Sequence, residues 1–272
     1  AVLVEWPERA GDHLPADRLR LALDIAGTGR RATLSGGGTW PARLARTMAV
    51  RALLDRAGWP AASRRHLQGD ASSRRYERIA AEHRTAVLMD WPARGMLPAG
   101  DTRAAFRARD VRAFLAVDEA LRAAGFSAPE IYAADAAAGL VLMEDFGALG
   151  VLRDGAPDPE RYRAVIEVLA AIHAAPRPRD LPIPGGGSHT LMDLSPAVLA
   201  ADVALFADWY VPHVLGAPLA AADRAALDAI WQALFARLAA AEKSWVLFAV
   251  PSANLFWLLG RRGLARVGLI DF

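Results

Sequence analysis

The stretch Leu140-Val141-Leu142-Met143-Glu144-Asp145-Phe146-Gly147 divides the sequence into two parts with different patterns. Short apolar runs, typical of β-strands, lie mostly before it, and long runs with helical spacing lie mostly after it. Strands are predicted at 75–79, 86–89, 131–133, 140–143, 246–248, 255–258 and 267–270. Helices are predicted at about 102–124, 161–175, 196–215 and 222–241, with a loop at 180–188. Strands that precede helices in this way indicate an α+β fold.

Residues 1–45 form a separate pattern. Val2–Trp6 is predicted to be a short strand, and the alternation of apolar and polar residues at 19–25 predicts a half-buried strand. Glycines at 27 and 29 predict a hairpin turn with a returning strand at 31–34, and a helical pattern follows. We therefore expect three parts, at 1–45, 46–146 and 147–272.

The composition indicates a globular chain. Of 272 residues, 54% are hydrophobic and 23% charged, which excludes disorder, and the net charge of +2 predicts no dense surface for nucleic acid. No apolar run reaches the roughly 18 to 20 residues of a membrane helix, so we expect a cytoplasmic protein without membrane segments. The absence of cysteine excludes disulfides and thiolate chemistry. Oligomeric state is left open.

The sequence contains a single lysine, Lys243, in Glu242-Lys243-Ser244-Trp245. A phosphate-binding P-loop requires its lysine beside glycines, so this chain contains no P-loop. Phosphate binding must then depend on arginine, backbone N–H groups or metal. The loop from Gly69 to Arg75 has small residues that let backbone N–H groups approach a phosphate. The alternative is a surface turn with two solvated arginines. Its candidate phosphate-binding residues are Gly69, Asp70, Ser72, Ser73, Arg74 and Arg75.

Asn254 and Asp271 carry hard oxygen atoms of the kind that Mg²⁺ prefers, one before a predicted strand and one after the next strand. The alternative is a turn asparagine and an unrelated aspartate. Contact between the two side chains would favour the metal site, and a large separation would favour the alternative.

The order of these motifs resembles the aminoglycoside phosphotransferase-like family, over about residues 60–272. The resemblance is to the branch that phosphorylates the anomeric hydroxyl of N-acetylmuramate and N-acetylglucosamine. The matching segments are 69–76, Val87-Leu88-Met89-Asp90-Trp91-Pro92, 142–147, 205–210, Asn254-Leu255 and 269–272. The resemblance implies a protein-kinase-like bilobal fold, with a strand-rich N-lobe and a helical C-lobe, that uses ATP and Mg²⁺ on a sugar substrate.

The resemblance also implies roles for individual residues. Backbone groups at Met143, Glu144, Asp145 and Phe146 would bind adenine, and Asn254 and Asp271 would hold the metal. Asp208, Trp209 and Tyr210 would line the sugar site, although core packing is an equally good explanation of that motif.

One position departs from the family pattern. The aspartate that accepts the proton of the attacked hydroxyl falls on Ala249 in this sequence, and alanine cannot accept a proton. We therefore expect weak or no turnover. The alternative is a non-catalytic pseudokinase or scaffold module that binds nucleotide or a partner.

The N-terminal part resembles a different protein. Val4-Glu5-Trp6-Pro7-Glu8-Arg9 and the following hairpin are similar to the C-terminal end of TsaE-type ATPases, which serve tRNA threonylcarbamoyladenosine modification. This resemblance implies a fusion of such an ATPase with a sugar-kinase-like domain. The chain begins without methionine and ends within a predicted strand, so we expect a segment of a longer product with an incomplete C-lobe.

Overall fold

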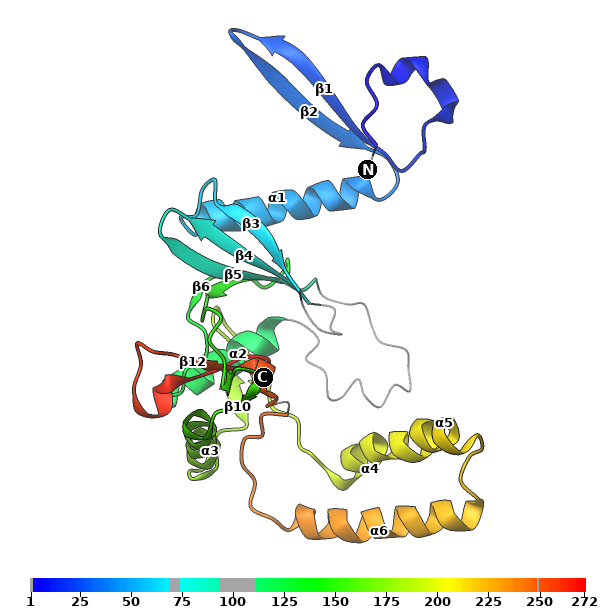
Figure 1. Cartoon of the computed structure of the whole chain (residues 1–272), viewed down its shortest axis with the longest axis vertical. Coiled ribbons are helices and arrows are strands. Elements are labelled where there is room, and N and C mark those ends of the chain that lie inside the picture. Colours follow the sequence, from blue (N-terminus) through cyan, green and yellow to red (C-terminus); the bar gives the residue numbers. More distant parts are fainter. Residues whose placement is uncertain (1, 69–73, 93–110, 249) are drawn as a thin grey trace. The chain divides into compact units, whose positions relative to one another are not determined.

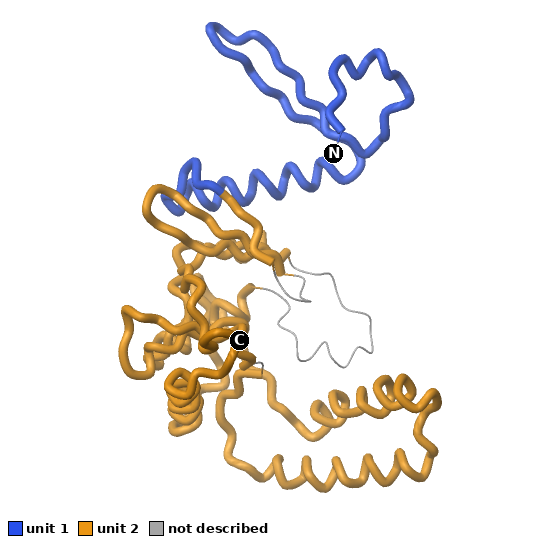
Figure 2. Tube along the Cα trace, viewed as in Figure 1, with its two compact units in different colours: residues 1–63 blue, residues 64–272 orange. Residues whose placement is uncertain are grey.

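The computed structural model describes residues 2–68, 74–92, 111–248 and 250–272 (Figure 1). The chain divides into two compact units, Ala1–Ser63 and Arg64–Phe272 (Figure 2).

Unit 1 contains the predicted hairpin, with β1 (Leu19–Ala26) antiparallel to β2 (Gly29–Gly36). Helix α1 (Trp40–Arg56) follows, and the short helices η1 (Pro7–Arg9) and η2 (Gly11–His13) precede the hairpin. The strand expected at Val2–Trp6 is not formed, because Trp6 has a φ of 56° and Pro7 begins a 3₁₀ turn. Most side chains of β1 are exposed, so the expected half-buried strand is wrong about burial.

Unit 2 begins with a five-stranded sheet in the order β3-β4-β5-β7-β6. Its strands are β3 (Ser63–Leu67), β4 (Arg75–Ala81), β5 (Arg84–Asp90), β6 (Ile131–Asp135) and β7 (Leu140–Glu144). The last four match the predicted strands and pair antiparallel. Strand β3 was not expected because its sequence is polar, and its side chains are mostly exposed.

Helix α2 (Val111–Ala123) ends two residues before Gly125, close to the predicted end at 124, and the predicted start at 102–110 lies outside the described residues. Gly125 has a φ of 89°, and the amide of Phe126 donates to the carbonyl of Leu121 over 3.0 Å, which closes the helix. The next residue, Ser127, bonds to the C-terminal strand β13 (Val267–Leu269): the amide of Leu269 donates to its carbonyl over 2.8 Å. The hydroxyl of Ser127 donates to the carbonyl of Ala265 over 2.7 Å. The segment that follows α2 is therefore hydrogen-bonded to β13.

The remaining elements follow in chain order. They are β8 (Leu152–Arg153), β9 (Ala156–Pro157), α3 (Pro159–His173), β10 (Asp180–Pro182), β11 (Ser188–Thr190), α4 (Pro196–Leu205), the π turn η4 (Phe206–Tyr210), α5 (Val211–Leu215), α6 (Ala221–Ala239), η5 (Ser252–Asn254), β12 (Leu255–Trp257) and η6 (Gly263–Arg266). The expected loop at 180–188 forms β10, the turn and the first residue of β11 in the β10–β11 hairpin, and the strand expected at 246–248 is not formed.

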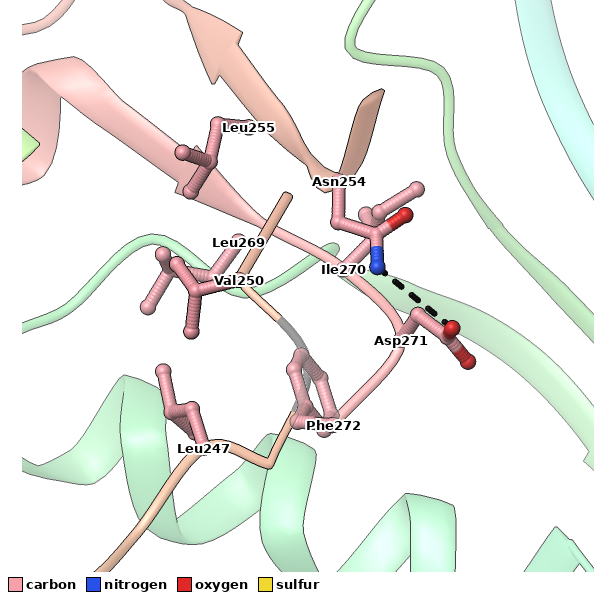
Figure 3. Close-up of a pocket in the computed structure, with 8 residues that line it drawn as sticks. All are labelled: Leu247, Val250, Asn254, Leu255, Leu269, Ile270, Asp271 and Phe272. Atoms are coloured by element: carbon pink, nitrogen blue, oxygen red, sulfur yellow. Dashed lines mark hydrogen bonds between the residues drawn. The ribbon is translucent and has the colours of Figure 1, made fainter. Parts of the chain in front are cut away.

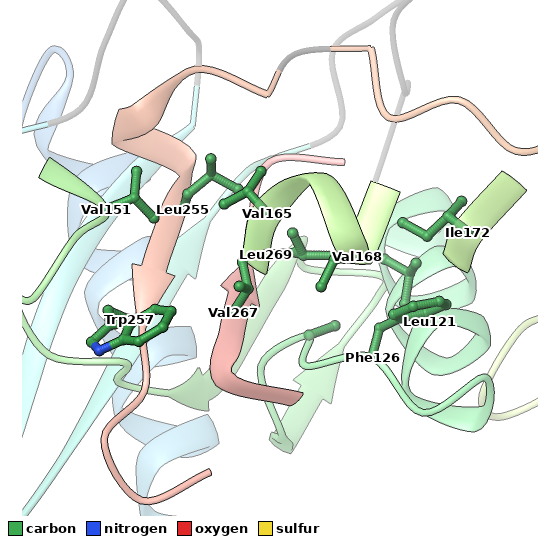
Figure 4. Packing of buried hydrophobic residues seen from close by; sticks show 11 residues of the cluster. Leu121, Phe126, Val151, Val165, Val168, Ile172, Leu255, Trp257, Val267 and Leu269 are labelled. Carbon is green, nitrogen blue, oxygen red and sulfur yellow. The ribbon is translucent and has the colours of Figure 1, made fainter. Parts of the chain in front are cut away.

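One apolar core cluster of unit 2 joins α3 to the β12–β13 hairpin and to the end of α2 (Figure 4). Its buried side chains include Val165, Val168 and Ile172 of α3 and Leu255 and Leu269 of the hairpin. This packing holds the hairpin in place.

Among the described residues, one helical run, Pro196–Leu215, is long and apolar enough to cross a membrane, judged by length and composition alone. Asp202 and Asp208 interrupt its sequence, which is why it does not stand out as an apolar run.

Candidate functional site

The β12–β13 hairpin brings the two predicted metal ligands together. Asn254 ends η5 immediately before β12, and Asp271 lies two residues after β13. The amide of Ile270 donates to the carbonyl of Asn254 over 3.1 Å, which extends the ladder past the strands. The Asn254 Nδ2 donates to the Asp271 Oδ2 over 3.4 Å (Figure 3). The two side chains therefore lie side by side at one end of the hairpin.

A small pocket surrounds this pair. Six of its eight lining residues are apolar, namely Leu247, Val250, Leu255, Leu269, Ile270 and Phe272 (Figure 3). Asp271 is the sole ionisable side chain among the described lining residues. Phe272 stacks on Phe114 of α2, with ring centroids 5.2 Å apart, and this contact holds the end of the chain. Asn254 and Asp271 are thus the two polar residues in a pocket lining that is otherwise apolar.

The oxygen atoms of this pair fit Mg²⁺. Magnesium usually takes one or two protein oxygens and completes its octahedron with water and substrate phosphates. The carboxylate of Asp271 and the amide oxygen of Asn254 provide such a partial set. Within the described part of the chain, no three His, Cys, Asp or Glu residues cluster to hold a metal. A divalent ion here would therefore depend on oxygen atoms from a bound phosphate.

An arginine meets the same carboxylate. Arg74, just before β4, forms an ion pair with the Oδ1 of Asp271, and its guanidinium lies 4.5 Å from the ring centroid of Trp91. Arg75 is exposed and pairs across the sheet with Asp90 in the β4–β5 register. The other loop candidates, Gly69, Asp70, Ser72 and Ser73, lie outside the described residues.

The segment 143–146, predicted to bind adenine and called the hinge below, has two acidic side chains that contact other elements. Glu144 accepts a hydrogen bond from the Nη2 of Arg261 over 2.5 Å, and Asp145 pairs with the Nε of Arg78 over 2.7 Å. Asp145 also accepts from the amide of Gly147 over 2.9 Å. Both carboxylates therefore order the segment at the end of β7.

Met143 and Phe146 belong to the apolar part of this segment. Met143 is buried in β7, opposite Val87 of β5. The ring of Phe146 lies 5.6 Å from that of Phe256 in β12 and packs over Gly268 in β13. A Cβ at Gly268 would come within 2.8 Å of the Phe146 ring, so only glycine fits there without a shift. The hinge thus rests on the same hairpin that carries Asn254 and Asp271.

Asp208, Trp209 and Tyr210 lie in the π turn η4. Asp208 forms an ion pair with Arg224 of α6, and Trp209 and Tyr210 are 72% and 58% exposed. None of the three is among the described residues that line the pocket at Asn254 and Asp271. The structure does not bring this motif to the pocket.

The departure at Ala249 lies outside the described residues. Leu247 and Val250, on either side of it in sequence, line the same pocket as Asn254. The described residues on both sides of Ala249 therefore lie along this pocket.

A further titratable group is buried in α2. Asp118 is fully buried, and neither of its carboxylate oxygens has a hydrogen-bond partner among the residues that the structure describes. Burial raises the pKa of Asp118 from 3.8 to about 7; the charge of Arg122 opposes this, and those of Glu119 and Glu144 add to it. The helical spacing of Val111, Phe114, Leu115 and Leu121 places Asp118 on the apolar face of α2, whereas the neighbouring acid, Glu119, is exposed.

Comparisons with known proteins agree with the order of these parts. Residues 63–272 match the model of the phosphotransferase enzyme family. A relative from Caulobacter vibrioides, an N-acetylmuramate/N-acetylglucosamine kinase, is 33% identical over 244 residues, which are 84% of this chain and 67% of the relative. A kinase of the same name from Pseudomonas aeruginosa is 32% identical over 168 residues, 60% of this chain and 43% of the relative.

The solved Rio2 kinase from Chaetomium thermophilum has 16% identity and a TM-score of 0.30, with 68% of this chain and 59% of that chain covered. The chain spans about two thirds of the Caulobacter relative and less than half of the Pseudomonas relative.

Proposed function

The chain belongs to the phosphotransferase enzyme family, and from this membership we propose that it binds ATP with Mg²⁺ and transfers the γ-phosphoryl group slowly to a sugar hydroxyl. The proposed acceptor is an amino sugar of the N-acetylmuramate and N-acetylglucosamine type, the class named for two relatives. The observation that supports the proposal is the pairing of Asn254 with Asp271 over 3.4 Å in a pocket that is otherwise apolar.

The proposed work of the site is positioning and charge neutralisation. Phosphoryl transfer involves little covalent chemistry by the protein, so most of its catalysis comes from holding the phosphates and offsetting their charge. Asn254 and Asp271 would hold Mg²⁺, which when bound neutralises and orients the phosphates. Backbone groups of Met143 to Phe146 would bind adenine, and Arg74 and Arg75 would lie on the phosphate side.

The transfer step is proposed to be slow because Ala249 offers no base. A positioned general base contributes about 10²- to 10⁴-fold in rate. Without one, the proton of the attacking hydroxyl must pass to solvent water. The same residue favours the second candidate function, a non-catalytic nucleotide-binding module that uses this site without transfer.

Two measurements test the proposal. Thermal unfolding with ATP, with and without Mg²⁺, should show metal-dependent stabilisation in the wild type that is lost in Asp271→Ala. Asp202→Ala, which removes an exposed carboxylate of α4, is the matched control and should keep it. A wild type that no nucleotide stabilises would overturn nucleotide binding.

Turnover separates the two candidate functions. With labelled ATP and N-acetylmuramate, we expect slow transfer in the wild type and a rise of about 10²-fold or more in Ala249→Asp. Transfer by the wild type at about 10 per second, an ordinary enzyme rate, would refute the slow step. Nucleotide binding without any transfer in either protein would favour the non-catalytic module.

A further inference from the structure

The positive charge at the Asn254–Asp271 pair comes from an arginine. The chain's single lysine, Lys243, is 60% exposed and pairs with Asp193 over 3.1 Å, so it is engaged elsewhere. The last residue of strand β5 is Asp90, an acid, so the end of this strand supplies no positive charge. Arg74 is the basic side chain that contacts Asp271 among the described residues. A phosphate that approaches this pair would therefore meet the guanidinium of Arg74.

Both oxygens of the Asp271 carboxylate are engaged in this arrangement. Arg74 pairs with Oδ1, and the Nδ2 of Asn254 donates to Oδ2. A divalent ion that binds Asp271 must compete with these contacts, and its charge repels the guanidinium. The repulsion is relieved when an anion with several oxygens lies between the two cations.

The side chain of Arg74 has a fixed orientation that suits the binding of such an anion. It is only 14% exposed, and its guanidinium lies over the ring of Trp91. A planar guanidinium presents N–H groups in a fork that matches two phosphate oxygens, and stacking on an aromatic ring fixes its orientation. Lysine has no comparable geometry.

We propose that Arg74 is the residue that couples phosphate binding to metal binding in this domain. Without nucleotide, Arg74 neutralises Asp271 and keeps divalent ions from its carboxylate. A nucleotide phosphate takes over the guanidinium and leaves the carboxylate to the metal. Nucleotide and metal therefore bind with positive coupling, and each binds weakly alone. This inference rests on the proposed nucleotide binding of the preceding subsection and adds the order in which the site fills.

Binding measurements on the full chain test this coupling. Mn²⁺ binding is followed by electron paramagnetic resonance with and without ATP, and metal-free ATP and adenosine binding by calorimetry. In Arg74→Met, the nucleotide-free Mn²⁺ affinity should rise about tenfold and the metal-free ATP affinity should fall about tenfold, the range for one charge-assisted hydrogen bond. Adenosine affinity should not change, because adenosine has no phosphate.

Two further variants serve as controls. Arg74→Lys keeps the charge but loses the fork, and should lie between the wild type and Arg74→Met. Arg65→Met removes an exposed arginine of β3 in the same sheet and should behave as the wild type. Equal melting temperatures for Arg74→Met, Arg74→Lys and the wild type show that differences in binding do not come from unfolding.

The outcomes distinguish this inference from the proposed function. A wild type that binds neither ATP nor Mn²⁺ with ATP contradicts both. A wild type that binds both, with an Arg74→Met variant whose ATP and Mn²⁺ affinities are unchanged, overturns the role of Arg74 alone. Loss of adenosine binding in Arg74→Met would also overturn it, because the defect would then not be specific to phosphate.

Discussion

Replacement of Asp118 by asparagine should stabilise the protein at neutral and alkaline pH. The side chain is buried in α2, no described residue forms a hydrogen bond with it, and burial raises its pKa from 3.8 to about 7. The unfolded chain ionises this carboxyl near 3.8, whereas the folded protein resists ionisation. The protonated form therefore stabilises the fold, and this stability is fully present below pH 3.8 and is lost as the pH rises to about 7.

The size of the effect follows from the two pKa values. Each pKa unit corresponds to about 1.4 kcal/mol, so the interval from 3.8 to about 7 is worth roughly 4 kcal/mol. Asparagine has nearly the same shape and no charge, so Asp118→Asn escapes this loss. The difference in free energy of unfolding between variant and wild type should grow by about 2 kcal/mol between about pH 5 and pH 7. Above about pH 8 it should stay constant.

Urea unfolding of both proteins from about pH 4 to pH 9 measures this difference. Asp202→Asn, which changes an exposed carboxylate of α4, is the control variant for the same substitution at a surface position. A difference for Asp118→Asn that does not change with pH would show that the carboxyl is solvated or paired in solution, and the reasoning from its burial would fail.

Two substitutions test other parts of the frame around the site. Gly268→Ala should lower the free energy of unfolding by about 1–3 kcal/mol, because its Cβ would come within 2.8 Å of the Phe146 ring; a melting temperature equal to the wild type's would contradict this packing. Asp158→Ala should cost about 1 kcal/mol, since the Oδ1 of Asp158 accepts from the amides of Glu160 and Arg161 at the start of α3. Asp158→Asn keeps a capping oxygen and should recover most of that stability in the same urea titration, so equal losses in the two variants would argue against a capping role.

The sequence predicts the elements whose pattern is local. Alternation and the glycines at 27 and 29 predict the β1–β2 hairpin, and the expected protein-kinase-like α+β fold is confirmed over residues 63–272 by the family match. Strand β3 is missed because a polar, exposed edge strand has no apolar pattern. The strand at Val2–Trp6 is wrong because β-propensity does not outweigh the turn that Pro7 begins.

The candidate site also has a part that the sequence predicts and a part that it does not. The meeting of Asn254 and Asp271 is predictable, because a hairpin places the residues that flank its strands at one end. The pairs Arg74–Asp271 and Arg261–Glu144 join residues 197 and 117 positions apart, and no local pattern marks such partners. The roles of Ala249 and of the Asp208 motif stay predictions. The TsaE-type fusion, its link to tRNA modification, the absence of nucleic-acid binding and a cytoplasmic location also stay predictions.

The bonds of Ser127 have a mechanical consequence for Asp271. Strand β13 is held on one edge by β12 and on the other by the residue that follows the turn closing α2. The backbone that carries the carboxylate therefore cannot slide without breaking bonds to two neighbours at once. Any adjustment on ligand binding should then occur in the side chain of Arg74, while the aspartate acts as the fixed reference point.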